Sequence, residues 1–212
     1  MPCGIGTRCA CARLVAMPSV TSPGRSLTVA DWLALPEGSR FELIDGELVE
    51  KAAPTFEHGR AQGRTVGAVG ALFDRRPGGT GGPGGWWIAP EVDIVLEGRG
   101  FRPDVAGWRR ARATAPPVER PISLRPDWIC EIVSESNRAV DTVIKLRRYH
   151  QAGVPHYWIL DQIDRTLTVH RHLPDGYLVA VRAEAHERVR AEPFELVELS
   201  VAHLLGDDPD DA

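Results

Sequence analysis

Two short segments of alternating polarity on either side of an Asp-Gly pair give the clearest structural signal in the chain. Residues 40–44 and 47–50 alternate between apolar and polar side chains, and Asp45 and Gly46 separate them. An Asp-Gly pair accepts the positive φ angles of a type I′ turn, which joins adjacent antiparallel strands. The sequence therefore predicts a β-hairpin over residues 40–50.

Other segments carry apolar side chains at helical spacing or begin with a helix-capping residue. Thr28 and Asp31 have the spacing of an N-terminal cap. Gly153 can adopt the left-handed conformation that often follows a helix. The predicted helices are residues 28–35, 56–73, 138–152 and 200–205.

Runs rich in β-branched and aromatic residues, bounded by turn residues, predict the remaining strands. They cover residues 86–88, 91–96, 101–108, 128–133, 154–160, 166–170 and 177–181. Stretches rich in proline and glycine predict loops over residues 77–85 and 109–126. This mixture predicts an α/β fold in which helices flank a mixed central sheet and the hairpin lies near the N-terminus.

The length of 212 residues and the hydrophobic content of 43% are sufficient for one domain with a full core. We expect this domain to span residues 26–206. Residues 1–25 are predicted to be a disordered extension, and residues 207–212, which are mostly aspartate, a disordered acidic tail.

Charge and cysteine content exclude several classes of protein. The net charge of -4 and the pI near 6.0 argue against a uniformly basic surface, although arginines group at residues 75–76, 109–112 and 147–148. The cysteines lack the paired spacing of a zinc site. No run approaches the ~20 apolar residues of a membrane span, and the N-terminus lacks the apolar core of a signal peptide. We therefore expect a cytoplasmic protein without a membrane partner.

Glu131 is the most unusual residue of the predicted strands. It lies within residues 128–133, a run otherwise so apolar that both of its faces should be covered. A buried, ionised carboxylate requires a cation, a metal or a set of hydrogen-bond donors. We therefore expect the functional site around the partner of Glu131.

Asp104 is the second candidate acid. It follows Pro103 at the predicted edge of a strand, where a proline removes no central ladder bond. If the two strands are neighbours, Asp104 and Glu131, with a backbone carbonyl near Ile132, form an oxygen-rich site suited to Mg²⁺. An ammonium group beside them would steady the attacking water or the developing negative charge of a phosphoryl reaction.

Only Lys51 and Lys145 are lysines among the 25 basic residues, and Lys145, on the helix predicted after Glu131, is the candidate ammonium. This order of two acids and a lysine resembles the PD-(D/E)xK nuclease superfamily, with Val133 at the position where the lysine usually stands. This displaced lysine resembles the pattern of the Uma2 family of restriction endonuclease-like proteins, in which the lysine lies on the next helix. The matching segments, in the expected order over residues 27–205, are 41–48, His58, 102–105, 131–136, Asp141 with Lys145 and Tyr149, and 153–161.

The resemblance implies a restriction endonuclease-like core and Mg-dependent hydrolysis of DNA phosphodiester bonds. It implies a metal site at Asp104 and Glu131 for Mg²⁺, with Mn²⁺ as an alternative. Lys145 completes this site, and Glu42 is a supporting acid from the N-terminal part. A homodimer is expected by analogy, because two related sites can cut both strands of a duplex.

Simpler interpretations of the same residues remain open at this point. Glu131 can form a structural ion pair with Arg102. Asp141 and Lys145, four residues apart, have the spacing of a surface ion pair. Glu42 alternates with apolar neighbours and can face solvent, and a lone histidine such as His58 is more often a cap or a core residue than a base.

Two other functions are also compatible with the sequence. One is a module that kept the nuclease fold without catalysis and binds nucleic acid or protein. The other is a metal-dependent phosphodiesterase acting on RNA or a small nucleotide. Substrate profiling with chelator controls separates both from a DNA endonuclease.

Overall fold

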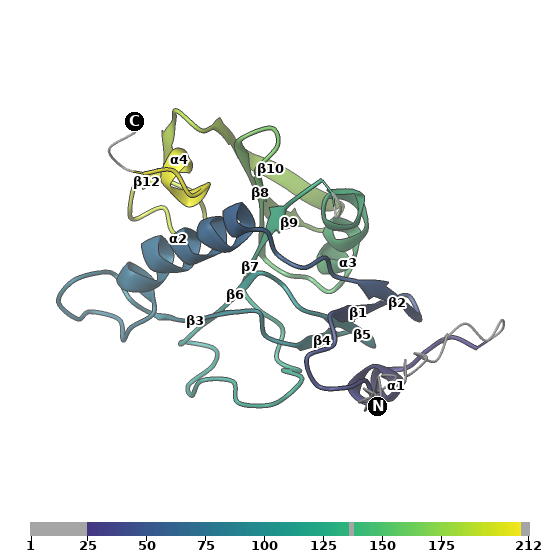
Figure 1. Cartoon of the computed structure of the whole chain (residues 1–212). Coiled ribbons are helices and arrows are strands. Elements are labelled where there is room, and N and C mark those ends of the chain that lie inside the picture. Colours follow the sequence, from purple (N-terminus) through teal and green to yellow (C-terminus); the bar gives the residue numbers. More distant parts are fainter. Residues whose placement is uncertain (1–24, 136–137, 209–212) are drawn as a thin grey trace, which may run out of the picture.

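A six-stranded mixed sheet forms the centre of the fold (Figure 1). The computed structural model describes residues 25–135 and 138–208. In spatial order the strands are β10 (Gly176–Glu184), β9 (Thr166–Leu173), β8 (His156–Asp161), β7 (Trp128–Val133), β6 (Val105–Arg109) and β3 (Trp86–Pro90). Within this sheet β7 and β8 are parallel and the other neighbours are antiparallel. The parallel pair needs a crossover, which the helical segments η1 (Val140–Lys145) and α3 (Leu146–Gln151) provide.

A smaller antiparallel sheet lies beside the first and contains the N-terminal hairpin. Its spatial order is β2 (Glu47–Glu50), β1 (Phe41–Ile44), β5 (Arg99–Phe101) and β4 (Ile94–Leu96). Asp45 and Gly46 at the hairpin turn have φ angles of 53° and 83°, as a type I′ turn requires. The helix α1 (Val29–Leu33), which begins with a Thr28 capping box, precedes the hairpin.

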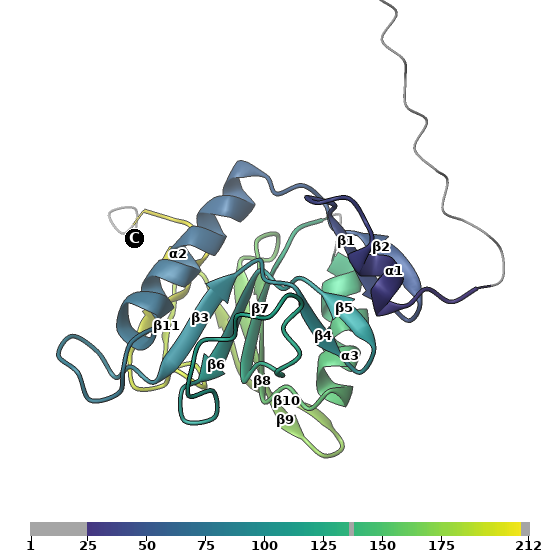
Figure 2. The ribbon, with the colours of Figure 1, turned by 90° about the horizontal axis from the view of Figure 1, so that it is seen from below.

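The central strands separate two hydrophobic cores. Figure 2 shows the long helix α2 (Phe56–Phe73) and the crossover helix α3 on opposite sides of these strands. Residues of β7 alternate between the cores: Cys130 and Ile132 pack with α2, whereas Ile129 and Val133 pack with Tyr149 of α3. Glu131 thus points toward the α3 side, as the two-residue period of a strand dictates.

The C-terminal part completes the first core. A two-stranded sheet of β11 (Arg188–Val189) and β12 (Leu199–Ser200) leads into the short helix α4 (Val201–Leu204). Val201 and Leu204 of α4 belong to the same core cluster as Val69 of α2. None of the described helices is long and apolar enough to cross a membrane.

Most predicted elements are confirmed, including the hairpin, the helix over residues 56–73 and the fully buried strand around Glu131. The mixed α/β fold is confirmed as well. The proposed disorder of the two ends falls largely on residues 1–24 and 209–212, which lie outside the described residues.

Two predicted strands have the wrong bounds, because each prediction includes a crossing between the sheets; residues 94–96 and 105–108 are strand, as expected. Residues 91–96 and 101–108 were each expected to form a single strand, but in both segments the chain crosses from one sheet to the other. The first crossing follows Pro90, where Glu91 has a positive φ of 51°. The second contains Pro103, which cannot donate to a ladder. The two crossings lie side by side and are joined by a hydrogen bond, in which the Glu91 amide donates to the Asp104 carbonyl at 3.3 Å.

Candidate active site

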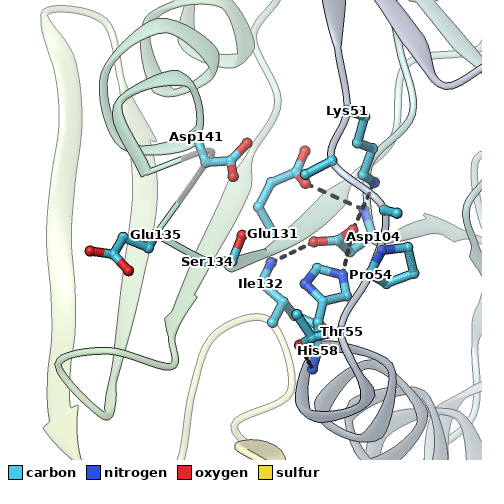
Figure 3. Close-up of a pocket in the computed structure, with 12 residues that line it drawn as sticks. Lys51, Pro54, Thr55, His58, Asp104, Glu131, Ile132, Ser134, Glu135 and Asp141 are labelled. Atoms are coloured by element: carbon cyan, nitrogen blue, oxygen red, sulfur yellow. Dashed lines mark hydrogen bonds and ion pairs between the residues drawn. The ribbon is translucent and has the colours of Figure 1, made fainter.

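Asp104 lies at the second crossing between the sheets. Its Oδ2 accepts the backbone N–H of Ile132 at 2.7 Å. Its Oδ1 lies 2.7 Å from Lys51 Nζ and 3.3 Å from His58 Nε2, and Figure 3 shows these contacts converging on one carboxylate. The Asp104 carbonyl accepts from Gln62 Nε2 at 2.8 Å. Asp104 is therefore fixed by β7, by the N-terminal half of α2 and by the residue that follows β2.

Glu131 on β7 supplies the second carboxylate. Its Oε1 accepts from the Tyr149 hydroxyl at 2.8 Å and from Lys145 Nζ at 3.1 Å. Its Oε2 lies 3.4 Å from the backbone nitrogen of Asp104, which makes a long hydrogen bond. The two acids that the sequence analysis selected are thus neighbours, and the weakly bonded oxygen of Glu131 is the one on the Asp104 side.

Lys145 is the last residue of η1 and contacts three carboxylates. Its Nζ lies 2.8 Å from Glu42 Oε2, 3.1 Å from Glu131 Oε1 and 3.1 Å from Asp141 Oδ1. The segment η1 is a π-helix, a wider turn that is rare and frequent at functional sites. Asp141 and Lys145 contact each other and are both buried, so both side chains point inward. Tyr149, four residues further on, also reaches Glu131.

Lys51 was not predicted as a site residue, yet it is the lysine that contacts Asp104. Its backbone N–H donates to the Arg40 carbonyl at 2.7 Å and so extends the hairpin beyond β2. Its Nζ also donates to the Arg102 carbonyl at 2.7 Å and to Glu91 Oε1 at 3.2 Å. The scarcity of lysine was a usable signal in the sequence, but only the folded hairpin brings Lys51 to the crossing that contains Asp104.

Burial and neighbouring charge shift the two acids in opposite directions. Burial opposes ionisation of Asp104, but the Lys51 ammonium and the hydrogen bond from His58 outweigh it and hold the pKa of Asp104 well below its usual value. For Glu131, burial dominates over the attraction of Lys145 and raises the pKa well above its usual value; the Asp104 charge adds to this effect. Acids whose pKa values are pushed apart are typical of functional sites.

Both lysines carry their charge. Burial favours the neutral amine of Lys51, but the charges of Asp104 and Glu131 outweigh it and raise the pKa of Lys51. Burial acts in the same way on Lys145, and its three carboxylate neighbours raise the pKa of that ammonium well above its usual value. The site therefore contains two fixed positive charges, one at Asp104 and one at Glu131.

A cavity of about 390 Å³ opens beside these groups (Figure 3). Its lining includes the two predicted metal ligands, Asp104 and Glu131, and six further polar residues, namely Lys51, Thr55, His58, Ser134, Glu135 and Asp141. Glu42 and Lys145, the other two predicted site residues, are not among the described residues that line it. They contact each other, and Lys145 connects them to two residues that do line it, Glu131 and Asp141.

The donor chemistry of the cavity suits a hard divalent cation, which prefers carboxylate oxygens. His58, Glu91 and Asp104 have ligand atoms within 4.8 Å of one another. In that cluster, however, the Lys51 ammonium already contacts Glu91 and Asp104. Glu131 Oε2 has one hydrogen bond among the described residues, the long one from Asp104. Lys51 contacts Asp104 in either arrangement, so the Asp104 and Glu131 pair and the His58, Glu91 and Asp104 cluster both have the donor chemistry of a divalent-cation site.

Three of the simpler interpretations are wrong. Arg102 pairs with Asp93 at 2.6 Å, so Arg102 is not the partner of the buried strand glutamate. Asp141 and Lys145 are 3% and 1% exposed, which excludes a surface ion pair. Glu42 is 2% exposed and does not face solvent. Glu42, Asp141 and Lys145 are instead part of the buried ionic network around Glu131.

Comparisons with known proteins agree with this architecture. The model of the Uma2 family, described as "Putative restriction endonuclease", matches residues 29–202. A crystal structure described as a putative nuclease belonging to DUF820 from Anabaena variabilis ATCC 29413 superposes with a TM-score of 0.67. The two chains are 19% identical, and the alignment covers 84% of this chain and 97% of that one, which shows a shared fold. No curated protein matches the sequence significantly.

Proposed function

The chain belongs to the Uma2 family, and from this premise we propose that it hydrolyses DNA phosphodiester bonds in a Mg²⁺-dependent reaction. One observation carries the proposal: the carboxylates of Asp104 and Glu131, distant in sequence, meet at one cavity. The family description and the nuclease-like neighbour support hydrolysis of a phosphodiester.

Asp104 and Glu131 would hold the cation through their carboxylate oxygens, and Mn²⁺ could replace Mg²⁺. A cation held there would polarise a phosphoryl oxygen and lower the pKa of a bound water molecule. Five carboxyl groups surround two ammonium groups, so a divalent cation would supply positive charge that favours the ionised form of Glu131, whose pKa burial raises. Unpaired buried negative charge is unfavourable, and a divalent ion would offset it.

Glu42 and Lys145 act on the reaction through Glu131 in this proposal. Lys145 donates to Glu131 Oε1, so the opposite oxygen, Oε2, is directed toward Asp104. Glu42 orients Lys145 and also accepts the backbone N–H of Arg102 at 2.8 Å. These two residues are therefore positioning residues of the metal site.

The overall reaction is a hydrolysis. The oxygen of a water molecule bonds to phosphorus, and the bond from phosphorus to the leaving sugar oxygen breaks. The attacking water loses one proton, and the leaving oxygen gains one. Negative charge develops on the phosphoryl oxygens during this exchange, so positive charge and hydrogen-bond donors at the cavity lower the barrier.

An arginine-lined hollow supports a nucleic acid as the substrate. Two of the arginine groups in the sequence meet at the outer end of β3 and β6, where Arg76, Arg109 and Arg110 line a hollow of about 690 Å³. Arg109 and Arg110 lie over the rings of Trp86 and Trp87. The same two strands lead to Asp104 at their other end. Phosphates bound along this edge would place a nucleic-acid backbone in line with the cavity.

Cleavage of plasmid DNA by the purified chain tests the proposal. We expect nicking in Mg²⁺ or Mn²⁺ that a chelator abolishes and that Asp104→Asn and Glu131→Gln each remove. The matched control variants are Asp175→Asn and Glu119→Gln, because both residues are exposed and outside the site. Equal activity of the two site variants and the wild-type chain would refute the assignment.

The rival functions give different results in the same assay. A non-catalytic module would retain DNA without cutting it in either metal, and its binding would not change in Lys145→Ala. A phosphodiesterase for RNA or a small nucleotide would leave plasmid DNA intact but cleave those substrates with the same metal requirement.

A further inference from the structure

We propose that Lys51 is the catalytic ammonium of this site and contacts the phosphoryl group or the attacking water. Lys145 then serves as the counter-ion of the buried carboxylates. This inference rests on the proposed function and deepens it, because it assigns the positive charge that faces the substrate. It departs from the expectation that the helix lysine completes the site.

The first reason is position. Lys51 lines the cavity, and its Nζ lies 2.7 Å from Asp104 Oδ1. Figure 3 shows the Lys51 side chain reaching down to the carboxylate from the segment that precedes α2. Lys145 contacts Glu131 Oε1, whereas Glu131 Oε2 is the oxygen on the Asp104 side. Lys145 is not among the described residues that line the cavity. A substrate entering the cavity therefore meets Lys51.

The second reason is the kind of partner that each lysine has. Lys51 donates to Glu91, whose side chain is 30% exposed, at the comparatively long distance of 3.2 Å. Gln62 Nε2 also donates to Glu91 Oε1, at 3.3 Å, so Glu91 keeps a partner when Lys51 turns away. Lys51 can therefore exchange this contact for a phosphate oxygen and retain its bonds to Asp104 and the Arg102 carbonyl.

Lys145 has no comparable contact to exchange. Its partners Glu42, Asp141 and Glu131 have side chains that are 3%, 5% and 1% exposed. Moving its ammonium toward a substrate would leave these buried carboxylates without their cation, which is strongly unfavourable. The three carboxylate partners explain why Lys145 can be buried as an ammonium. They do not give that ammonium access to the cavity.

The chemistry fits an ammonium at the position of Lys51. The hydrolysis adds negative charge to the phosphoryl oxygens as the water oxygen bonds to phosphorus and the sugar oxygen leaves. A preorganised donor in a partly buried site stabilises that charge, and removing one such donor lowers a rate by about 10²- to 10³-fold. Lys51 is held by Asp104, so the donor and one proposed metal ligand are fixed in one unit.

The test compares Lys51→Met and Lys51→Arg with the wild-type chain, with Asp104→Asn as the reference for the metal site. Single-turnover nicking in Mg²⁺, Mn²⁺ binding by calorimetry, thermal unfolding, and DNA affinity in Ca²⁺ are measured for each. For Lys51→Met we expect a folded protein that binds Mn²⁺ at least as well as the wild type but nicks about 10²- to 10³-fold more slowly. DNA binding should weaken on the order of tenfold, the effect of losing one charge-assisted hydrogen bond. Lys51→Arg should recover part of the rate.

Other outcomes separate this inference from the proposed function. If Lys51→Met nicks at the wild-type rate while Asp104→Asn is inactive, the nuclease assignment stands and the role of Lys51 is refuted. Loss of Mn²⁺ binding in Lys51→Met would assign Lys51 a structural role in holding Asp104 and would also refute the inference. A wild-type chain that cuts no substrate with any divalent metal would overturn both.

Discussion

Glu42 Oε2 and Lys145 Nζ lie 2.8 Å apart and join the N-terminal hairpin to the crossover between β7 and β8. The other oxygen of Glu42 accepts the backbone N–H of Arg102 at 2.8 Å, at the crossing between the two sheets. One buried glutamate thus connects the smaller sheet, the crossing and the crossover helix. The ion pair aligns the elements that carry Asp104 and Glu131.

Lys145→Met should therefore destabilise the whole fold. The substitution removes the shared cation of three buried carboxylates, and breaking such a network by removing one partner costs about 3–5 kcal/mol. Urea denaturation at neutral pH measures the loss. Arg147→Met is the matched control, because Arg147 is exposed on α3, which directly follows η1, and it should change stability by less than about 0.5 kcal/mol. A Lys145→Met protein as stable as the control would contradict the network.

Divalent cations should stabilise the folded chain. A ligand that binds only the native state raises the free energy of unfolding by about 2.7 kcal/mol at a concentration of 100 times its Kd. Thermal unfolding with increasing Mn²⁺ or Mg²⁺ should show a rising midpoint that a chelator reverses. Asp104→Asn should remove the dependence, whereas Asp175→Asn, at an exposed turn, should keep it. An identical rise in both variants would place the cation elsewhere.

Gly100 tests how tightly the smaller sheet packs on α1. A Cβ atom at this position would lie 2.4 Å from Cε3 of Trp32, a ring that is 5% exposed and whose Nε1 donates to the Phe41 carbonyl. Gly100→Ala should destabilise the protein by about 1–3 kcal/mol because the ring must move.

Gly67→Ala is the opposite case and serves as the control. Gly67 lies within α2, and a Cβ there would meet nothing within 4 Å. Alanine is the better helix former by about 1 kcal/mol, so this variant should be more stable than the wild type. Chemical denaturation of both variants shows whether each substitution raises or lowers the free energy of unfolding. A neutral or stabilising Gly100→Ala would mean that Trp32 does not pack as described.

Local patterns were sufficient to predict much of the fold and that Asp104 and Glu131 are neighbours. The Asp45-Gly46 turn follows from the φ preferences of two adjacent residues, and the buried strand around Glu131 follows from its composition. Asp104 could be paired with Glu131 because it stands at the start of a predicted strand that is the neighbour of the Glu131 strand. Each of these predictions depends on a few neighbouring residues. Such local conformational preferences are kept in the folded protein when no tertiary contact opposes them.

The missing features depend on contacts between distant segments. The chain leaves the larger sheet after Pro90 and returns after Asp104, and no local pattern indicates which sheet a strand joins. Lys51 reaches Asp104 only because the hairpin is placed beside that crossing. The π-helical geometry of Val140–Lys145 has no local signal either, because its sequence has ordinary helical spacing.

His156 should make the stability of the protein sensitive to acid. Its side chain is 15% exposed at the start of β8, and its Nδ1 has no hydrogen-bond partner among the described residues. Burial, followed by the positive charge of Arg109, lowers the pKa of His156 to about 4. The unfolded chain binds the proton with a pKa of about 6.5.

The sign of the effect follows from these two values. Between pH 6.5 and 4 the unfolded state binds more protons at His156 than the folded state does, so stability falls as pH decreases through this window. The two pKa values correspond to a loss of about 2 kcal/mol in the free energy of unfolding at pH 5. Partial exposure of the ring reduces the expected loss to about 1 kcal/mol. Glu192 Oε2, 3.9 Å from Nδ1, would act in the opposite direction by favouring the protonated ring.

Urea denaturation of the wild type and His156→Gln at pH 7 and pH 5 isolates the contribution of His156, because the buried acids titrate equally in both proteins. The wild type should lose about 1 kcal/mol more than the variant between these pH values, whereas equal losses would mean that His156 is protonated in the folded state.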